Sequence, residues 1–316
     1  MKRLFCILIG LLLLAAPLTG CAGGGKEPEE GSGKLSIVST LFPQYDFARR
    51  IAGEKAEVTL LLPPGTESHT YEPTPSDIVG ISKADLFLYT GAVMEPWADK
   101  ILKSLGSDAP RVADVSAGIE AAAAEHRGHE GEEHGEETHT VDPHIWLDPV
   151  NAQIIADDIL AGLKEASPAD AAYFEENAAG LKADLAQLDK DFRAAADGAA
   201  YKTLAFGGRF AFTYFCNRYG LSHVSAFDSC SAESEPSVSA VAKVISTIEE
   251  QSLPAVYYEE FTDPKVANSI AEQTGARPLL LHTVHNVSKE DREAGVTYLD
   301  LMRQNLENLR IGLNGE

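Results

Sequence analysis

The feature that most limits the fold of this chain is a regular alternation of short apolar runs with segments of helical periodicity, beginning at residue 35. Such runs predict strands, and the segments between them predict helices. The first set predicts strands near 35–40, 57–62, 86–90 and 110–114, and helices near 43–53, 75–83 and 95–105. The second set predicts strands near 202–206, 222–227, 255–258 and 277–281, and helices near 210–219, 236–251, 263–274 and 289–309. Alternating strands and helices fold as parallel sheets covered by helices, so we expect two α/β domains.

The two sets are separated by residues 168–198, for which the pattern predicts one long helix. Gly and Pro are absent between Pro168 and Gly180. Apolar residues then recur at helical spacing, at Leu181, Leu185, Leu188 and Phe192. A helix of about 28 residues is roughly 40 Å long, the length of a whole domain. We therefore expect a rigid helix that joins domain 35–167 to domain 199–316.

Residues 1–20 have the pattern of an export signal. Lys2 and Arg3 precede an apolar run that is too short to span a bilayer comfortably. The run ends in Leu18-Thr19-Gly20-Cys21, which resembles the lipobox of bacterial lipoproteins. We expect removal of residues 1–20, acylation of Cys21 and a polar tether over residues 21–34, which places the chain on the extracytoplasmic face of the cell membrane. The alternative is a plain secretory signal with an incidental cysteine.

Charge composition restricts the partners of the chain. The sequence carries 26 Lys and Arg against 48 Asp and Glu, a formal net charge of -22. The expected signal contains Lys2 and Arg3 but no carboxylate, so its removal makes the chain more acidic still. A chain of this charge repels phosphate backbones, which excludes nucleic acid as a partner. Beyond residue 20, no apolar stretch is long enough to cross a membrane.

Two cysteines remain to form a disulfide once Cys6 leaves with the signal and Cys21 is acylated, and these are Cys216 and Cys230. An oxidising exterior permits a disulfide. However, Cys216 lies in an expected helix and Cys230 lies beyond the strand that follows, so the chain carries Cys230 past Cys216. Because a disulfide needs Cα atoms within about 7 Å, we expect these two cysteines not to pair.

Two histidines lie in loops that each lead into a helix. His69 lies in the motif PPGTESHTYEPTPSD, after an apolar strand and before a helix capped by Thr74 with Pro75 at its first position. His144 lies in the motif DPHIWLDP, before a helix that begins at Asp148. Ligands of open α/β sheets bind at the carboxyl ends of strands, and neutral imidazole is a good zinc ligand. The pair therefore indicates a metal site.

These two motifs resemble those of the metal-binding solute-binding lipoproteins of ABC importers, the ZnuA-like family. The resemblance covers essentially the whole mature chain. It implies two α/β domains joined by a rigid helix, with the metal in the cleft between them. It also implies that His69 and His144 are the first two metal ligands, and that the partners are an ABC permease and its ATPase.

The second domain departs from the pattern of that family. The family places a His or Glu ligand directly before an Ala-Phe-x-Tyr-Phe helix, and this chain has Arg209 there. Arginine stays charged and cannot bind a metal ion. The family's fourth ligand is an Asp after the last strand, where this chain has His282 and His285. We expect His285, alone or with His282, to replace the missing ligands, and both can bind only if the chain turns between them.

The charge of Arg209 requires a compensating carboxylate, because a cation close to a divalent ion repels it. The candidates follow later strands and are Glu259, Glu260, Glu233 and Glu235. An alternative role for any one of them is that of an oxygen ligand. The sequence leaves the choice among them open.

The loop over residues 119–141 is rich in histidine and glutamate. Its histidines are His126, His129, His134 and His139. This composition suits the weak collection of zinc or copper. In the resembling family, a similar insertion accompanies zinc proteins more than manganese proteins. An acidic solvated loop is the alternative.

We interpret the chain as a monomeric extracytoplasmic lipoprotein that captures a divalent transition metal for an ABC importer. Imidazole ligands favour Zn²⁺ over Mn²⁺, which prefers carboxylate oxygen, although copper would bind the same ligands more tightly. Neither HExxH nor GxSxG occurs, so the sequence does not indicate an enzyme. The alternatives are a manganese receptor, a receptor for an intact metal chelate, and a surface lipoprotein for metal storage or adhesion.

Overall fold

The computed structural model describes residues 33–122, 141–227 and 236–315, and residues 34–316 form one compact unit. The expected signal, the anchor Cys21 and most of the tether lie outside the described residues. So do several positions that the sequence singled out, namely His126, His129, His134, His139, Cys230, Glu233 and Glu235. Within the described ranges, no helix is both long and apolar enough to cross a lipid bilayer.

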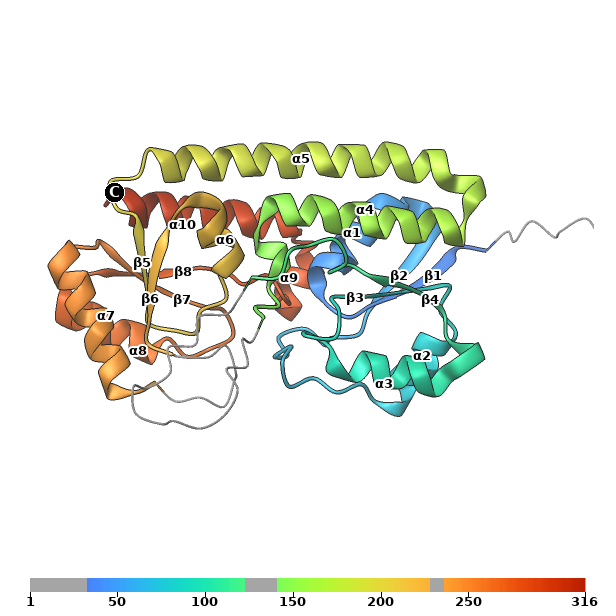
Figure 1. Cartoon of the computed structure of the whole chain (residues 1–316), viewed down its shortest axis with the longest axis horizontal. Coiled ribbons are helices and arrows are strands. Elements are labelled where there is room, and N and C mark those ends of the chain that lie inside the picture. The colour runs from blue at the N-terminus through green and yellow to red at the C-terminus, as the bar shows by residue number, and fades with distance from the viewer. Residues whose placement is uncertain (1–32, 123–140, 228–235, 316) are drawn as a thin grey trace, which may run out of the picture. The chain divides into compact units, whose positions relative to one another are not determined.

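The first domain is built on a parallel four-stranded sheet (Figure 1). Its strands are β1 (Leu35–Ser39), β2 (Ala56–Leu60), β3 (Leu86–Tyr89) and β4 (Arg111–Asp114). Their order in the sheet is β2-β1-β3-β4, and Ile37 of β1 aligns with Val58 on one side and Leu86 on the other. All residues of β3 are buried, as expected of a strand with helices on both faces.

The second domain repeats this topology. Its strands are β5 (Thr203–Phe206), β6 (Ser222–Ser225), β7 (Ala255–Tyr258) and β8 (Arg277–Leu280). They are parallel and lie in the order β6-β5-β7-β8, which is the order of the first sheet shifted by four strands. The prediction of two α/β domains is confirmed.

Helices cover both faces of the first sheet. Successive residues of a strand point to opposite faces, and apolar side chains on both faces need to be buried. The helices of this domain are α1 (Phe42–Ala52), α2 (Pro75–Ser82), α3 (Pro96–Leu105) and α4 (Pro149–Ala166). Ile37 and Leu88 belong to the same buried cluster as residues of α1 and α4. Val38 and Phe87 point the other way and share a separate cluster with residues of α2 and α3.

The second sheet is covered in the same manner. Its helices are α6 (Thr213–Tyr219), α7 (Val238–Gln251), α8 (Lys265–Thr274), α9 (Lys289–Ala294) and α10 (Tyr298–Asn314). Leu204 and Phe206 share a cluster with apolar residues of α10. Ala205 and Val256 lie in another cluster with residues of α7 and α8.

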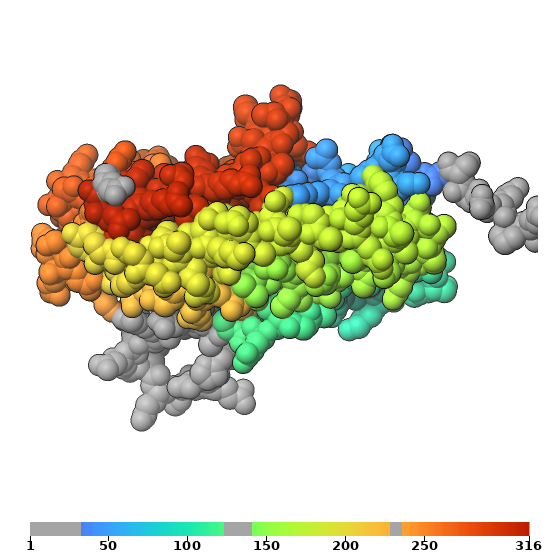
Figure 2. All heavy atoms as spheres, turned by 90° about the horizontal axis from the view of Figure 1, so that it is seen from above, coloured from blue at the N-terminus to red at the C-terminus, as the bar shows by residue number. Residues whose placement is uncertain are grey.

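The long helix that the sequence predicts between the domains is α5 (Ala171–Asp197), with 27 residues. Its buried residues recur every three or four positions, at Phe174, Ala178, Leu181, Leu185, Leu188, Phe192 and Ala196. The helix packs on α1 and α4 of the first domain and on α10 of the second, and Figure 2 shows it alongside α10. One buried cluster includes this stripe and core residues of both domains, so the domains share a core.

Two helices of the second domain differ from the prediction. The expected helix over 210–219 begins only at Thr213. The expected helix over 289–309 is divided into α9 and α10, so the prediction of a single helix was wrong. Gly295 ends α9 in the left-handed region with φ 73°, which costs glycine little, and Thr297 begins α10 with a capping box. Residues 289–294 are mostly polar and none of them is buried, so the apolar stripe belongs to α10 alone.

The candidate site residues follow the carboxyl ends of strands in both domains. His69 lies in the loop after β2, which ends at α2 with the expected Thr74 cap, and His144 lies directly before the short 3-10 helix Ile145–Leu147, which leads into α4. In the second domain, Arg209 follows β5 and His285 follows β8. Because parallel strands end at the same edge of their sheet, each domain gathers its own site residues at one edge.

A buried acidic residue fastens the carboxyl ends of β1 and β3. Glu95 is 3% exposed; its Oε1 accepts a 2.6 Å hydrogen bond from Thr40 Oγ1, and its Oε2 accepts one of 3.0 Å from the Thr90 amide. Burial raises the pKa of Glu95 to about 8, against the effect of these two hydrogen bonds. The side chain is therefore protonated in the folded chain at neutral pH.

The raised pKa of Glu95 makes the free energy of unfolding fall as the pH rises. Below pH 4.5, Glu95 is protonated in both the folded and the unfolded chain, so its ionisation takes nothing from the free energy of unfolding. Between pH 4.5 and 8 only the unfolded chain ionises, so the folded state loses on the order of a few kcal/mol. We expect Glu95→Gln to reduce the difference in unfolding free energy between pH 5 and pH 8, as measured by urea denaturation. Glu57→Gln, at an exposed position, is the control, and equal pH dependence in the two variants would contradict the assignment.

Candidate metal centre

The two histidines of the first domain lie against each other. The Nε2 atoms of His69 and His144 are 3.2 Å apart, and the two rings meet edge to face. Two nitrogens that share a tetrahedral zinc ion at 2.0 to 2.1 Å lie about 3.3 Å apart. The spacing of these two nitrogens therefore already suits one shared ion.

A buried carboxylate orients the ring of His144. Asp142 Oδ1 lies 2.7 Å from His144 Nδ1 and also accepts the His144 amide at 2.9 Å, and both side chains are almost fully buried. With its proton on Nδ1, the ring directs the lone pair of Nε2 at His69. Burial would raise the pKa of Asp142, but His144 and Thr213 outweigh this effect and hold it below its usual value. A carboxylate behind a histidine ligand is a common arrangement in metal sites.

The electrostatic surroundings keep the ring of His69 neutral. Burial lowers the pKa of His69 to about 4, and the close approach of His144 acts in the same direction. The carboxylate of Glu67 opposes them without reversing the shift. A neutral imidazole offers a lone pair to a metal ion and needs no deprotonation before it binds.

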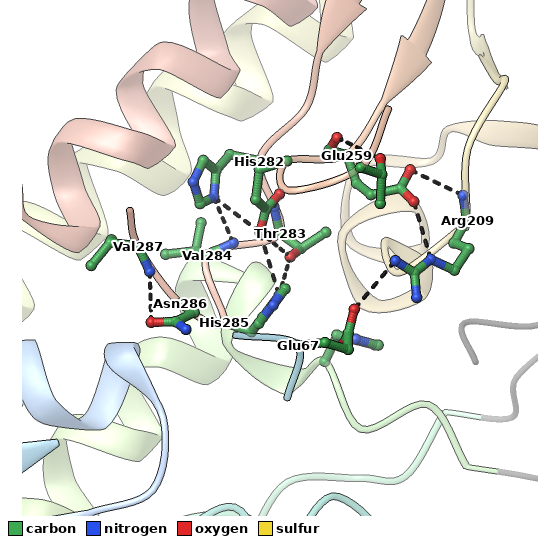
Figure 3. A network of polar contacts seen from close by, with 12 residues as sticks. Glu67, Arg209, Glu259, His282, Thr283, Val284, His285, Asn286 and Val287 are labelled. Atoms are coloured by element: carbon green, nitrogen blue, oxygen red, sulfur yellow. Dashed lines mark hydrogen bonds and ion pairs between the residues drawn. The ribbon is translucent and has the colours of Figure 1, made fainter. Parts of the chain in front are cut away.

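A relay of hydrogen bonds fixes the ring of His285 in the second domain (Figure 3). Thr283 Oγ1 donates to Glu260 Oε1 at 2.6 Å and lies 2.5 Å from His285 Nδ1. Since the hydroxyl proton is given to Glu260, Thr283 accepts the proton of Nδ1, and the lone pair of the ring is on Nε2. His285 Nε2 is buried and has no hydrogen-bond partner among the described residues. Burial lowers the pKa of His285, so this ring too is neutral.

The chain turns sharply between His282 and His285, as binding by both would require. Val284 has φ 62°, which is costly for a β-branched residue, of the order of 1–3 kcal/mol. The turn uses His282, because its Nδ1 accepts the amide of Val284 at 2.9 Å. The structure thus brings His282 beside Glu260, while its Nδ1 lone pair is engaged by the backbone. The role of His282 as a ligand stays a prediction.

Arg209 lies between two carboxylates. Its Nε is 3.1 Å from Glu259 Oε1, and its Nη2 is 3.2 Å from Glu67 Oε2. Glu259 was among the expected partners, whereas Glu67 was not. Glu260 serves the relay to His285 instead. Burial would raise the pKa of Glu67, but the neighbouring His285 and Arg209 outweigh this effect and hold it below its usual value, so Glu67 is ionised.

Hydrogen bonds tie the metal loops of the two domains together. Asn286 is fully buried, and its Nδ2 donates to Pro63 O at 2.7 Å and to Thr66 O at 2.9 Å. Trp146 Nε1 donates to Thr283 O at 2.8 Å, and the Trp146 ring lies edge to face against His144. The segment that carries His285 is therefore fixed to the loops that carry His69 and His144.

The described residues contain no group of three or more His, Cys, Asp or Glu side chains already arranged to hold an ion. The closely spaced pair is His69 and His144, and charge interactions link it to Glu67 and His285. Binding an ion with more than two protein ligands therefore requires a local shift of the third side chain.

Comparison with known proteins identifies the family of the chain. The model of the family described as "ZnuA: Zinc-uptake complex component A periplasmic" matches residues 37–312. The chain belongs to the ZnuA family. It is 36% identical over 311 residues to the high-affinity zinc uptake system protein ZnuA of Bacillus subtilis (strain 168), which covers 96% of this chain and 97% of that protein. Members of the family are solute-binding transport receptors, so the expectation of a protein that is not an enzyme is confirmed.

Two solved structures share the fold of this ZnuA-family chain. The metal-dependent lipoprotein YcdH from Bacillus subtilis has a TM-score of 0.76 and 35% identity, over 89% of this chain and 99% of that chain. The Zn(II)-bound ZnuA-like domain of Streptococcus pneumoniae AdcA has a TM-score of 0.75 and 30% identity, over 89% of this chain and 100% of that chain.

Sequence reasoning missed several residues around the ZnuA-type site. Glu67 is the only carboxylate between the end of β2 and His69, a position that could have drawn attention. Asp142 stands two residues before His144 within a motif already identified. Thr283 and Asn286 gave no signal, because their roles depend on contacts with distant loops.

The low pKa of His69 generates a direct prediction. We expect the Cε1–H resonance of His69, assigned with His69→Asn, to show no titration between pH 5.5 and 8 in a histidine NMR titration of the metal-free protein. The physical reason is burial together with the close approach of His144. Imidazole added to the same sample supplies the internal reference. A midpoint near 6.5 for His69 would show that the site is open to water.

Proposed function

We propose that this chain captures Zn²⁺ outside the cytoplasm and delivers it to an ABC importer. The observation that carries the proposal is the 3.2 Å separation of the Nε2 atoms of His69 and His144, with Asp142 directing the lone pair of His144 at the pair. Without metal, the Nε2 atoms of His69 and His144 share one proton. Zinc takes the place of that proton. His69 then carries its proton on Nδ1.

The third nitrogen ligand is His285. Its Nε2 is the one ring nitrogen near the pair that the structure buries without a hydrogen bond, among the residues it describes. A buried acceptor without a partner costs about 1–3 kcal/mol, and a bound cation removes that cost. The relay from Glu260 through Thr283 supports His285 as Asp142 supports His144. We assign His282 to the turn at Val284, where its Nδ1 is already engaged.

The nature of the donors supports zinc over manganese. Three neutral imidazoles form a borderline donor set that suits zinc, whereas manganese sites prefer oxygen. The name of the Bacillus subtilis relative refers to high-affinity zinc uptake, and the AdcA domain was solved with Zn(II) bound. These relatives support the same cargo for this chain.

Anchoring and delivery follow from the family and from the amino-terminal sequence. The family is described as a periplasmic component of a zinc-uptake complex, and one structural relative is named a lipoprotein. We propose that Cys21 carries the lipid and that an ABC permease with its ATPase receives the metal. The shared core around α5 favours a local rearrangement of side chains and loops over a wide hinge motion.

The segment over 119–141 adds an accessory role to the proposal. Its four histidines lie outside the described residues, and their composition supports weak collection of zinc. We propose that it supplies ions to the principal site without forming part of it.

The ligand assignment predicts the effect of removing single histidines. We expect His69→Ala, His144→Ala and His285→Ala each to raise the Kd for zinc by roughly 100-fold or more, since loss of a mere supporting partner already costs 10- to 100-fold. Competition with a fluorescent zinc chelator measures the effect. His126→Ala, which removes an imidazole from the 119–141 segment, should leave the tight site unchanged.

One outcome would contradict the assignment of the second domain in particular. If His285→Ala binds zinc with unchanged affinity while His69→Ala abolishes binding, the site lies in the first domain alone. If none of the three variants loses affinity, the proposed function fails as well.

A further inference from the structure

The position of Arg209 poses a chemical problem that the three histidines leave unanswered. Zinc in proteins usually has four ligands, and the ZnuA-like pattern places one of them where this chain has a guanidinium. Figure 3 shows Arg209 between Glu259 and Glu67, with a dashed contact to each. One of these carboxylates belongs to the loop of His69, which makes it the closer of the two to the metal ligands in the chain.

The backbone around Arg209 fixes the guanidinium on Glu259. Glu259 Oε2 accepts the Arg209 amide at 3.1 Å, and Glu259 Oε1 accepts Arg209 Nε at 3.1 Å. Gly208 permits this approach, since a Cβ there would lie 1.8 Å from Glu259 Oε2. Both oxygens of Glu259 are thus committed to Arg209. The remaining edge of the guanidinium, at Nη2, faces Glu67.

Glu67 is held by only one of its two oxygens. Oε2 pairs with Arg209 at 3.2 Å, whereas within the described part of the chain Oε1 accepts only a long 3.3 Å bond from the His69 amide. Its loop is fixed by Asn286, which donates to the carbonyl of the neighbouring Thr66. Glu260, by contrast, uses both oxygens to accept from the amide and hydroxyl of Thr283. Among the carboxylates that touch the site residues of the described chain, Glu67 has the oxygen with the longest hydrogen bond. This oxygen can exchange its hydrogen bond for a metal ion most easily.

We propose that Glu67 is the fourth ligand of the metal, through Oε1, and that Arg209 is the positioning residue that holds Oε2. This inference rests on the proposed function and adds a fourth ligand to it. Arg209 thus occupies the position of a family ligand without binding the metal itself. Its guanidinium orients the carboxylate of Glu67, which binds. Ligating carboxylates are commonly hydrogen-bonded in this way.

The arrangement also reduces the repulsion between Arg209 and the metal ion. An arginine beside a divalent ion would repel it, but Glu67 stands between the two charges and Glu259 balances the guanidinium from the other side. The carboxylate moves only enough to exchange the long bond to the His69 amide for the ion. This movement is one of the local shifts that a site with four protein ligands requires.

The first test removes the charge of Glu67 and leaves its shape. We expect Glu67→Gln to raise the Kd for zinc at least about tenfold, measured by chelator competition. Glu72→Gln, an exposed carboxylate in the same loop and the same change in net charge, is the matched control and should change the Kd less than about twofold. Equal effects of the two variants would overturn the assignment of Glu67.

A spectroscopic measurement reports the ligand directly and does not depend on affinity. Co²⁺ loaded in place of zinc gives visible d–d bands that respond to the donor set. We expect these bands to shift in Glu67→Gln and to coincide with the wild-type bands in Glu72→Gln. Unchanged bands in Glu67→Gln at full loading would show that the carboxylate is not bound to the metal.

The role of Arg209 is tested by a double-mutant cycle. We expect Arg209→Met to raise the zinc Kd at least about fivefold more in the presence of Glu67 than in the Glu67→Gln background, because its effect acts through Glu67. The same effect in both backgrounds would overturn the positioning role. Circular dichroism and urea midpoints verify that each variant folds.

The outcomes separate this inference from the proposed function. Loss of zinc binding in His69→Ala together with normal binding in Glu67→Gln would refute only the fourth ligand. Normal binding in both would refute the zinc site as a whole.

Discussion

The attachment of the segment after β8 to the loops of the first domain is the constraint on which the rest of the site depends. Asn286 binds the carbonyls at both ends of the turn before His69, and Trp146 binds the carbonyl of Thr283. These bonds place His285 opposite a histidine pair that comes from a different sheet. Without them, each domain would present only part of a metal site.

The strain in this segment has the same origin. Val284 adopts a left-handed conformation that a β-branched residue disfavours, and it does so while its amide binds the ring of His282. Strained backbone of this kind persists only where the surroundings determine it, and here the relay of Glu260 and Thr283 supplies that determination. The result is a His285 ring with a defined tautomer and an available nitrogen.

The fold and the first half of the site could be predicted from sequence, because both depend on local signals. The periodicity of α5 and the caps of α2 and α4 are properties of short segments, and His69 and His144 lie in recognisable strand-to-helix loops. The break at Gly295 was missed, although Gly295 and the Thr297 cap are local signals of a helix end and a helix start. The partners of Arg209 could not be chosen, since Glu67 and Glu259 reach it from segments far apart in the chain. The same holds for Asn286, whose role exists only once the two domains are in contact.

The central claim is that residues of both domains bind one zinc ion, and anomalous diffraction at the zinc edge tests it most directly. In a crystal grown from zinc-loaded protein, we expect one strong anomalous peak about 2.0 to 2.1 Å from the Nε2 atoms of His69, His144 and His285. A peak bound by His69 and His144 without His285, or a principal peak elsewhere on the chain, would contradict it.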